Sequence, residues 1–302
     1  MKLSLLFAGA GAAALLAGCA PTFYDGIPPG GPRDAYYADV GGARIRFVDE
    51  GEGPPIVLVH GFASALDTWR GVSKELVKKH RVIALDLKGF GWSSRPEGDY
   101  SPAAEAQIVL ALMDQRNVKQ AVVVAHSWGS SVALEMALQA PERVTRLALY
   151  DAWVYEEQLP TTFLWARATG VGEALFDLFY AERPDDKIAR AFYDPQKYVN
   201  EKFVEEVERA LDRPGTTAAA LAAVRGQQYA DVQKRYAQIK QPVLLLWGRE
   251  DEVTLLPFGE RLARDLPHAH LVVYPHCGHF PMIEAAGPST EELVKFLDEE
   301  AP

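Results

Sequence analysis

The sequence predicts an α/β fold with a doubly wound, mostly parallel sheet. Two observations predict it: short runs of Val, Ile and Leu alternate with helical runs over residues 43–149, and the same alternation resumes over residues 243–298. Strands that alternate with helices form parallel sheets covered on both faces, and such sheets carry their functional groups at the carboxyl ends of the strands. Residues 36–302 are long enough for one large domain of this kind with an insertion.

Each expected element rests on its own pattern. Strands are predicted where short apolar runs end at turn residues, and helices where apolar residues recur every three or four positions. The expected strands are residues 44–49, 56–60, 82–86, 122–125, 147–150, 243–247 and 271–274. The expected helices are residues 66–79, 103–116, 128–140, 257–265 and 289–298.

A turn through Ser127 follows the fourth expected strand. Residues 125–129 read Ala-His-Ser-Trp-Gly, with an apolar run before them and a helical run after them. A strand, a sharp turn through a serine and a helix form the nucleophile elbow, in which small residues on both sides let the turn close. Ala125 takes the place of the usual first glycine. The helix that follows directs its N–H groups and positive end at charge that develops beside the serine.

Four further segments have the character of turns at strand ends. They are His-Gly-Phe at residues 60–62, Asp-Leu-Lys-Gly-Phe-Gly-Trp-Ser at 86–93, Gly-Arg-Glu-Asp at 248–251 and Gly-His-Phe at 278–280. With the serine turn they resemble the α/β-hydrolase superfamily over roughly residues 36–300, and serine, acid and histidine follow that fold's chain order. The resemblance implies an α/β-hydrolase fold with a helical lid inserted after the sixth strand.

The resemblance also assigns catalytic roles. A serine hydroxyl needs a base within hydrogen-bonding reach, and His279 has the position of the family histidine. The histidine needs a carboxylate to fix its tautomer, and Asp251 matches that position. Asp151, directly after the strand ending at Tyr150, is an alternative acid, because some relatives carry the acid there. The backbone N–H groups of Phe62 and Trp128 are expected to form the oxyanion hole.

No cofactor or metal is expected. The histidines lack the spacing of metal ligands, and no phosphate-binding glycine loop is present. Cys277 is the second of two cysteines, and it has no partner if Cys19 is lipid-modified, so no disulfide framework is expected.

The stretch of about residues 152–238 shows no strand alternation and is rich in aromatic residues. In α/β-hydrolases an insertion at this place forms a helical lid over the site. Most of these aromatic side chains are expected to pack the lid onto the main domain. Together they predict an apolar pocket.

The first 18 residues predict a secretory signal. Met1-Lys2 is followed by an apolar stretch, residues 3–16, which is short for a membrane span. Leu-Ala-Gly-Cys at residues 16–19 resembles a bacterial lipobox, whose cysteine becomes the lipidated first residue. We expect a lipoprotein anchored at Cys19 in the bacterial cell envelope. In a Gram-negative source, Ala20 after the cysteine resembles the signal that sorts lipoproteins to the outer membrane. We then expect the domain to face the periplasm.

Residues 19–35 are expected to be the lipidated cysteine and a flexible tether, because prolines and glycines interrupt any periodicity. Removal of residues 1–18 takes away one Lys and no acid, so the net charge falls from −10 to −11. An acidic protein is a poor partner for nucleic acid or an anionic membrane surface. Membrane attachment is therefore expected from the anchor alone.

A nucleophilic serine favours acyl transfer over displacement of halide or epoxide opening, which use a carboxylate in related enzymes. The sequence therefore predicts a serine hydrolase with a small apolar carbonyl substrate, best matched by a carboxylic ester. Hydrolysis of a carbon–carbon bond and a proline iminopeptidase-like activity stay open as alternatives. A catalytically silent lipoprotein with a binding role is the competing class.

Overall fold

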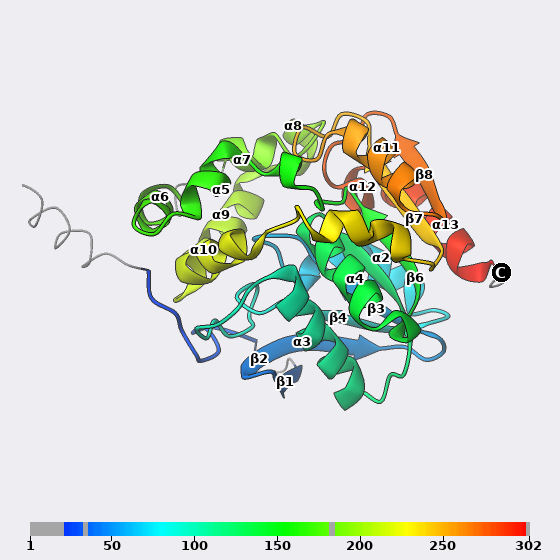
Figure 1. Cartoon of the computed structure of the whole chain (residues 1–302), viewed down its shortest axis with the longest axis horizontal. Helices are drawn as coiled ribbons and strands as arrows, with labels where there is room; N and C mark the ends of the chain where they lie inside the picture. Colours follow the sequence, from blue (N-terminus) through cyan, green and yellow to red (C-terminus); the bar gives the residue numbers. More distant parts are fainter. Residues whose placement is uncertain (1–20, 33–35, 181–184, 300–302) are drawn as a thin grey trace, which may run out of the picture.

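The computed structural model describes residues 21–32, 36–180 and 185–299. Its centre is an eight-stranded sheet with the order β1-β2-β4-β3-β5-β6-β7-β8 (Figure 1). The strands β3 to β8 run parallel to one another, and β2 is antiparallel to both of its neighbours, β1 and β4. The predicted doubly wound, mostly parallel sheet is confirmed.

The strands agree with the expected ones to within a few residues at each end. They are β1 (Tyr36–Val40), β2 (Ala43–Glu50), β3 (Pro55–Val59), β4 (Arg81–Leu85), β5 (Ala121–His126), β6 (Val144–Tyr150), β7 (Val243–Gly248) and β8 (Ala269–Tyr274). The sequence missed β1, whose residues Tyr-Tyr-Ala-Asp-Val lie at the sheet edge, where Val40 alone of the five is buried. An edge strand of this kind needs no apolar alternation, so it leaves little signal.

Helices cover both faces of the sheet. One face carries α3 (Pro102–Gln115), α4 (Trp128–Gln139) and α11 (Leu256–Asp265), and the other carries η1 (Leu66–Trp69), α2 (Arg70–Leu76), α12 (Pro281–Glu284) and α13 (Ala286–Asp298). Two separate apolar cores result, one between the sheet and each helical layer. The inner strands β3 to β7 therefore bury both of their faces, as their continuous apolar sequences predict.

A helical insertion lies between β6 and β7. It comprises α5 (Thr161–Ala166), α6 (Val171–Phe179), α7 (Asp185–Ala189), α8 (Pro195–Tyr198), α9 (Glu201–Leu211) and α10 (Thr216–Gly226). Short 3-10 turns lie at η2 (Pro141–Arg143), η3 (Glu156–Gln158) and η4 (Val232–Gln238). These helices form a layer across one end of the sheet (Figure 1). None of the helices described, here or elsewhere in the fold, has the length and apolar character to cross a membrane.

Residues 21–32 lie against the domain, which differs from the flexible tether predicted for residues 19–35. The backbones of Tyr24 and Arg95 exchange two hydrogen bonds of 2.8 Å each, forming an isolated β-bridge. Phe23 stacks on Tyr100 with ring centroids 6.0 Å apart. One bridge between positions so far apart in the sequence leaves no periodic pattern, so the sequence could not show it. Cys19 and residues 33–35 lie outside the described residues.

The turn after β5 depends on a close approach of two backbones. A Cβ atom on Gly129 would lie 2.4 Å from the carbonyl oxygen of His60 and 2.7 Å from that of Val59. Only glycine leaves room for α4 to begin so near the end of β3.

We predict that Gly129→Ala lowers the free energy of unfolding by about 1–3 kcal/mol, because the added methyl group meets backbone atoms that cannot move aside. Gly71→Ala is the matched control, since a Cβ atom there meets nothing within 4 Å and the residue lies in α2. Urea unfolding of the two variants measures the difference. Equal midpoints for Gly129→Ala and the wild type would contradict the prediction.

Candidate active site

Ser127 has a strained backbone between β5 and α4. Its φ is 50° and its ψ is −126°, a combination that non-glycine residues rarely adopt. Its N–H donates to the carbonyl of Tyr150 at 2.9 Å, and its own carbonyl accepts from Trp153 at 3.1 Å. Hydrogen bonds on both sides therefore hold the strained turn, as strain at a functional site requires. The side chain is almost buried but lines a cavity.

The loop after β3 lies against this turn. A Cβ atom on Gly61 would lie 3.0 Å from Cβ of Ser127, so glycine permits the approach. The next residue, Phe62, lines the same cavity as Ser127 and Trp128. Trp128 is the first residue of α4, so its N–H has no acceptor within the helix. The structure thus brings together the backbone segments that carry both predicted oxyanion donors.

His279 and Asp251 form the second part of the site. Nδ1 of His279 lies 2.8 Å from Oδ2 of Asp251, and the carboxylate assigns the proton to Nδ1. The imidazole therefore leaves Nε2 free to accept a proton. Three further contacts orient the carboxylate, from the N–H of Val253 at 2.7 Å and from the N–H and hydroxyl of Thr254 at 3.0 and 2.5 Å. Burial alone raises the pKa of Asp251, but His279 and these donors outweigh it and lower the pKa.

Asp151, the alternative acid, lies beside this pair, and its side chain makes no hydrogen bond to the histidine within the described residues. Its Oδ1 accepts the N–H of Gly248 at 2.9 Å, and its Oδ2 has no hydrogen-bond partner. One of its oxygens lies within 4.8 Å of a carboxylate oxygen of Asp251 and of a His279 ring nitrogen. Burial, and then the negative charge of Asp251, raise the pKa of Asp151 well above its usual value. Burial and the neighbouring charge thus favour the protonated form of Asp151, the opposite of what its surroundings do for Asp251.

The helical insertion and neighbouring loops hold the histidine turn. The N–H of His279 donates to the carbonyl of Ala191 at 2.7 Å, and the carbonyl of His279 accepts Nε2 of His126 at 2.8 Å. Burial lowers the pKa of His126 well below its usual range, and the neighbouring His279 lowers it further. His126 is thus a neutral donor that supports the catalytic candidate.

Two glutamates extend this support. Glu284 accepts from the N–H groups of Gly278, Tyr193 and Asp194, and so joins the histidine turn to the insertion. Glu250 accepts from the N–H of Cys277 at 3.1 Å. Sequence reasoning missed both roles, because nothing in the local pattern separates these glutamates from ordinary surface acids.

A cavity of about 2020 Å³ contains the site. Ser127 and His279 line it together with the oxyanion segments. Aromatic rings surround the serine: Phe62 lies 6.2 Å from Trp128 and 5.8 Å from Phe163, measured between ring centroids. The volume exceeds that of most small-ligand pockets, so the site has room for a large substrate.

The donor atoms of Asp151, Asp251 and His279 also form a grouping compact enough to hold a metal ion. These atoms already have hydrogen-bond partners, however. The carboxylate of Asp251 is bonded to His279 and to the hydroxyl of Thr254, and Oδ1 of Asp151 accepts the N–H of Gly248. Binding a cation there would break the contact that orients the imidazole. We assign no metal to the site.

Comparisons with known proteins agree with this geometry. The model of the alpha/beta hydrolase fold family matches residues 54–286, and the chain belongs to that family. A 2-hydroxymuconate semialdehyde hydrolase from Pseudomonas putida is 31% identical over 272 residues, which cover 85% of this chain and 92% of the relative. A pimeloyl-[acyl-carrier protein] methyl ester esterase from Nitrosomonas europaea is 30% identical over 254 residues, covering 80% of this chain and 94% of the relative.

Among solved structures, a meta-cleavage product hydrolase from Pseudomonas fluorescens IP01 superposes with a TM-score of 0.74 at 26% identity, covering 87% of this chain and 97% of that chain. The relatives thus include both carbon–carbon bond hydrolases and esterases. The family is one of hydrolases, and the bond that this chain cleaves is a separate question.

The raised pKa of Asp151 has a consequence for stability. A carboxyl whose pKa is raised on folding contributes stability that is complete below its unfolded pKa of 3.8 and is lost as the pH rises through the folded value. We predict that Asp151→Asn, which stays neutral, gains stability over the wild type as the pH rises from 4 to 9.

Urea unfolding at several pH values measures this. Asp251→Asn is the matched control: the pKa of Asp251 is lowered, so its contribution is complete above the unfolded pKa of 3.8 and is lost only as the pH falls below that value. The stability of this variant relative to the wild type should therefore stay nearly constant over most of the range from pH 4 to 9. Parallel profiles for Asp151→Asn and the wild type would mean that Asp151 is ionised in the folded protein.

Proposed function

We propose that the chain is a serine hydrolase that cleaves carboxylic esters of apolar small molecules through an acyl-enzyme. The observation that carries the proposal is the hydrogen-bonded pair of His279 and Asp251, which shares a cavity with the strained Ser127. A nucleophile, a base and an orienting acid are the groups that acyl transfer needs.

In the proposed mechanism, Oγ of Ser127 attacks the ester carbonyl while Nε2 of His279 takes its proton. The N–H groups of Phe62 and Trp128 stabilise the negative oxygen, and loss of one such donor typically costs on the order of 3 kcal/mol of transition-state stabilisation. His279 then gives the proton to the departing alcohol, which leaves Ser127 acylated. Water, deprotonated by His279, attacks the acyl group, and its proton returns to Ser127 as the acid is released.

Three features support an ester with an apolar acyl part. Aromatic rings surround the serine, the cavity is large, and one relative is a methyl ester esterase. The helices α5 to α10 act as the lid of this cavity in the proposal, and Phe163, Phe176 and Tyr180 line it from that side.

A second function, hydrolysis of a carbon–carbon bond beside a carbonyl group, is supported by the 2-hydroxymuconate semialdehyde hydrolase relative at 31% identity. The same serine and histidine serve both reactions, so the substrate decides between them. None of the relatives described above is a proline iminopeptidase, so they lend no support to that alternative.

A panel of p-nitrophenyl esters, aminoacyl anilides and dienone acids tests the function. We predict that the esters are cleaved fastest and that kcat/KM rises from short to medium acyl chains, by up to about 0.8 kcal/mol of binding for each buried methylene. Faster cleavage of the dienone acids would assign carbon–carbon hydrolysis, and faster anilide cleavage a peptidase. Turnover of none of the three would support the silent lipoprotein.

Variants test the residues on the best substrate of that panel. Ser127→Ala and His279→Ala should each remove nearly all turnover, and the double variant should be little worse than either, because triad residues act as a unit. Steady-state kcat measures the effect, with circular dichroism as a control for folding. Wild-type turnover in Ser127→Ala would rule out the acyl-enzyme.

We also propose that the protein is a lipoprotein of the bacterial cell envelope, held to the membrane by a lipid on Cys19. The support is Leu-Ala-Gly-Cys at the end of the apolar run in residues 3–16. In a Gram-negative source the proposal places it in the outer membrane, facing the periplasm.

Cys19→Ser should abolish incorporation of labelled fatty acid and leave the protein uncleaved or released, because the lipid is attached through the cysteine sulfur. Metabolic labelling followed by membrane fractionation measures both. Unchanged labelling in the variant would show that the lipid is attached to a residue other than Cys19 and would contradict the proposal.

A further inference from the structure

An exposed apolar surface lies on α5 and α6 of the helical insertion. Of the large apolar side chains that are exposed in the described residues, four belong to this stretch: Leu164 (41% exposed), Trp165 (58%), Val171 (46%) and Leu178 (64%). Val171 and Leu178 are seven positions apart on α6, so they lie on one side of that helix. We call these four residues the apolar stripe. Side chains of this size, gathered on neighbouring helices, mark an interaction surface.

The same two helices turn their other face to the active-site cavity. Phe163 of α5, Phe176 of α6 and Tyr180 just after it line that cavity, and Phe176 lies on the side of α6 away from Val171 and Leu178. The helices thus form a thin wall with the cavity on one side and the apolar stripe on the other. Burial of the cavity-lining side chains stabilises these helices. It does not explain why the exposed side chains of the stripe are apolar.

The surface around the stripe carries few charges that would resist an apolar partner. Residues 161–180 hold three charged side chains, Arg167, Glu173 and Asp177. Arg167 is paired with Glu156, and Glu173 with Arg225 at 2.9 Å. Neither pair includes a residue of the apolar stripe, and Asp177 is the exposed charged side chain that remains on α6.

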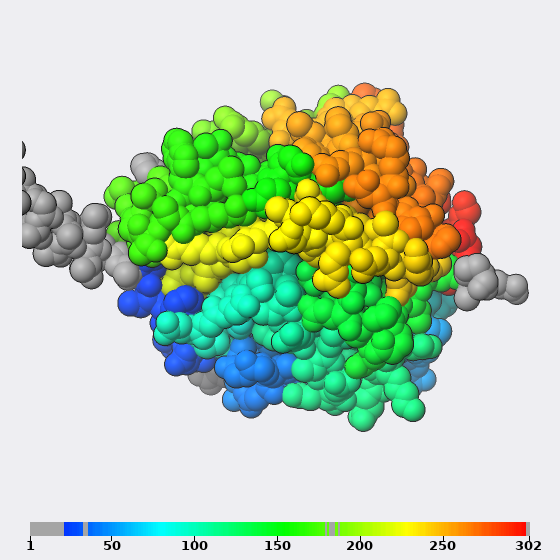
Figure 2. Space-filling view, viewed as in Figure 1, coloured from blue at the N-terminus to red at the C-terminus, as the bar shows by residue number. Residues whose placement is uncertain are grey.

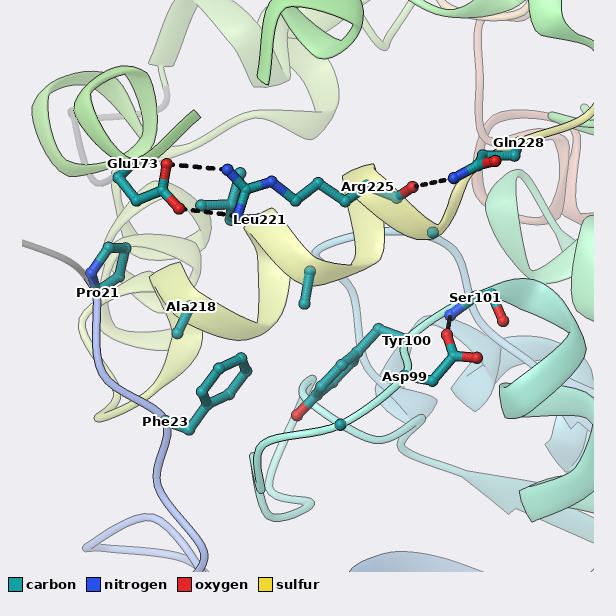
Figure 3. A pocket seen from close by; sticks show the side chains of 13 residues that line it. Pro21, Phe23, Asp99, Tyr100, Ser101, Glu173, Ala218, Leu221, Arg225 and Gln228 are labelled. Atoms are coloured by element: carbon teal, nitrogen blue, oxygen red, sulfur yellow. Dashed lines mark hydrogen bonds and ion pairs between the residues drawn. The ribbon is translucent and has the colours of Figure 1, made fainter. Parts of the chain in front are cut away.

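The start of the described chain lies beside this wall. Pro21 and Glu173 of α6 line one pocket of about 540 Å³ between the N-terminal segment and α10 (Figure 3). Phe23 and Tyr24 fix the segment there through the ring stack and the β-bridge. Figure 1 shows the chain entering the described part next to α6, at the end of the molecule away from α13. In the space-filling view, α5 and α6 form the surface at that end (Figure 2).

Cys19 is two residues before Pro21, and two residues span at most about 7 Å. A lipid on Cys19 therefore has a short reach, whereas an undocked tether of residues 19–35 would have let the domain stand well away from the bilayer. The docked segment brings the membrane to the end of the domain that carries the apolar stripe.

We propose that the apolar stripe on α5 and α6 docks on the surface of a phospholipid bilayer beside the lipid anchor. The inference rests on the lipoprotein part of the proposed function and is independent of the bond that the enzyme cleaves. Trp165 lies at the bilayer interface, where indole rings are favoured, and the leucines and valine enter the acyl region. The wall of the active-site cavity then faces the lipid, so apolar esters dissolved in the bilayer meet the enzyme at its insertion.

The test uses the lipidated full chain in phosphatidylcholine vesicles with bromine on the acyl chains, which quench indole fluorescence at short range. The wild type should lose part of its tryptophan emission relative to unbrominated vesicles. Trp165→Phe should remove most of that loss, because Trp165 is the one exposed tryptophan of the described residues: Trp69, Trp128 and Trp247 are fully buried, Trp153 is buried and Trp92 is half-buried. Leu178→Asp should reduce the loss, by placing a charge in the stripe.

Tyr36→Asp is the matched control, because Tyr36 is 64% exposed on β1 and lies outside the helical insertion. It should leave the quenching unchanged. Ser127→Ala should quench like the wild type, so failure of the proposed chemistry leaves this result intact.

Equal quenching of the wild type and Trp165→Phe would overturn the docking. So would an unquenched protein that still floats with the vesicles, which would leave the anchor in place but the stripe away from the lipid. A dimer that Leu178→Asp dissociates, in a protein without quenching, would assign the stripe to a second copy of the chain and overturn the proposal as well.

Discussion

The hydrogen bond between Nδ1 of His279 and Oδ2 of Asp251, 2.8 Å long, is the contact around which the site is arranged. It fixes the imidazole tautomer and leaves Nε2 as the acceptor. The Asp251 carboxylate is in turn held by Val253 and Thr254, and the histidine backbone by Ala191 and His126. A base that must accept a proton from a serine needs this degree of orientation, because a small rotation of the ring would lose the contact.

Asp151 shows how the surroundings separate two equivalent side chains. Both aspartates follow strands of the same sheet, at β6 and β7, and both are buried. Asp251 receives several donors and the histidine, so its charge is stabilised, whereas Asp151 receives one N–H and faces the negative charge of Asp251. The environment of each group, and not its residue type, therefore decides which carboxyl stays charged.

Much of the fold could be predicted because its strands are apolar runs that end at recognisable turns. The serine, histidine and acid segments follow such strands, and parallel strands bring their carboxyl ends to one edge of the sheet. The choice between Asp151 and Asp251 needed side-chain geometry, since both positions are compatible with the chain order. Contacts such as Glu284 with Tyr193, and Tyr24 with Arg95, join residues far apart in the sequence and leave no local pattern. The helical insertion was predicted as helix, but its two faces, one on the cavity and one exposed, follow only from packing.

The most direct test of the account is the rate at which a fluorophosphonate reagent modifies the protein at neutral pH, followed by mass spectrometry of the tryptic peptides. The account predicts one adduct, on Ser127, formed on the order of 10⁴-fold more slowly in Asp251→Asn and at nearly the wild-type rate in Asp151→Asn. An adduct on another residue, or the reverse ranking of the two aspartate variants, would contradict the claim that Asp251 and His279 activate Ser127.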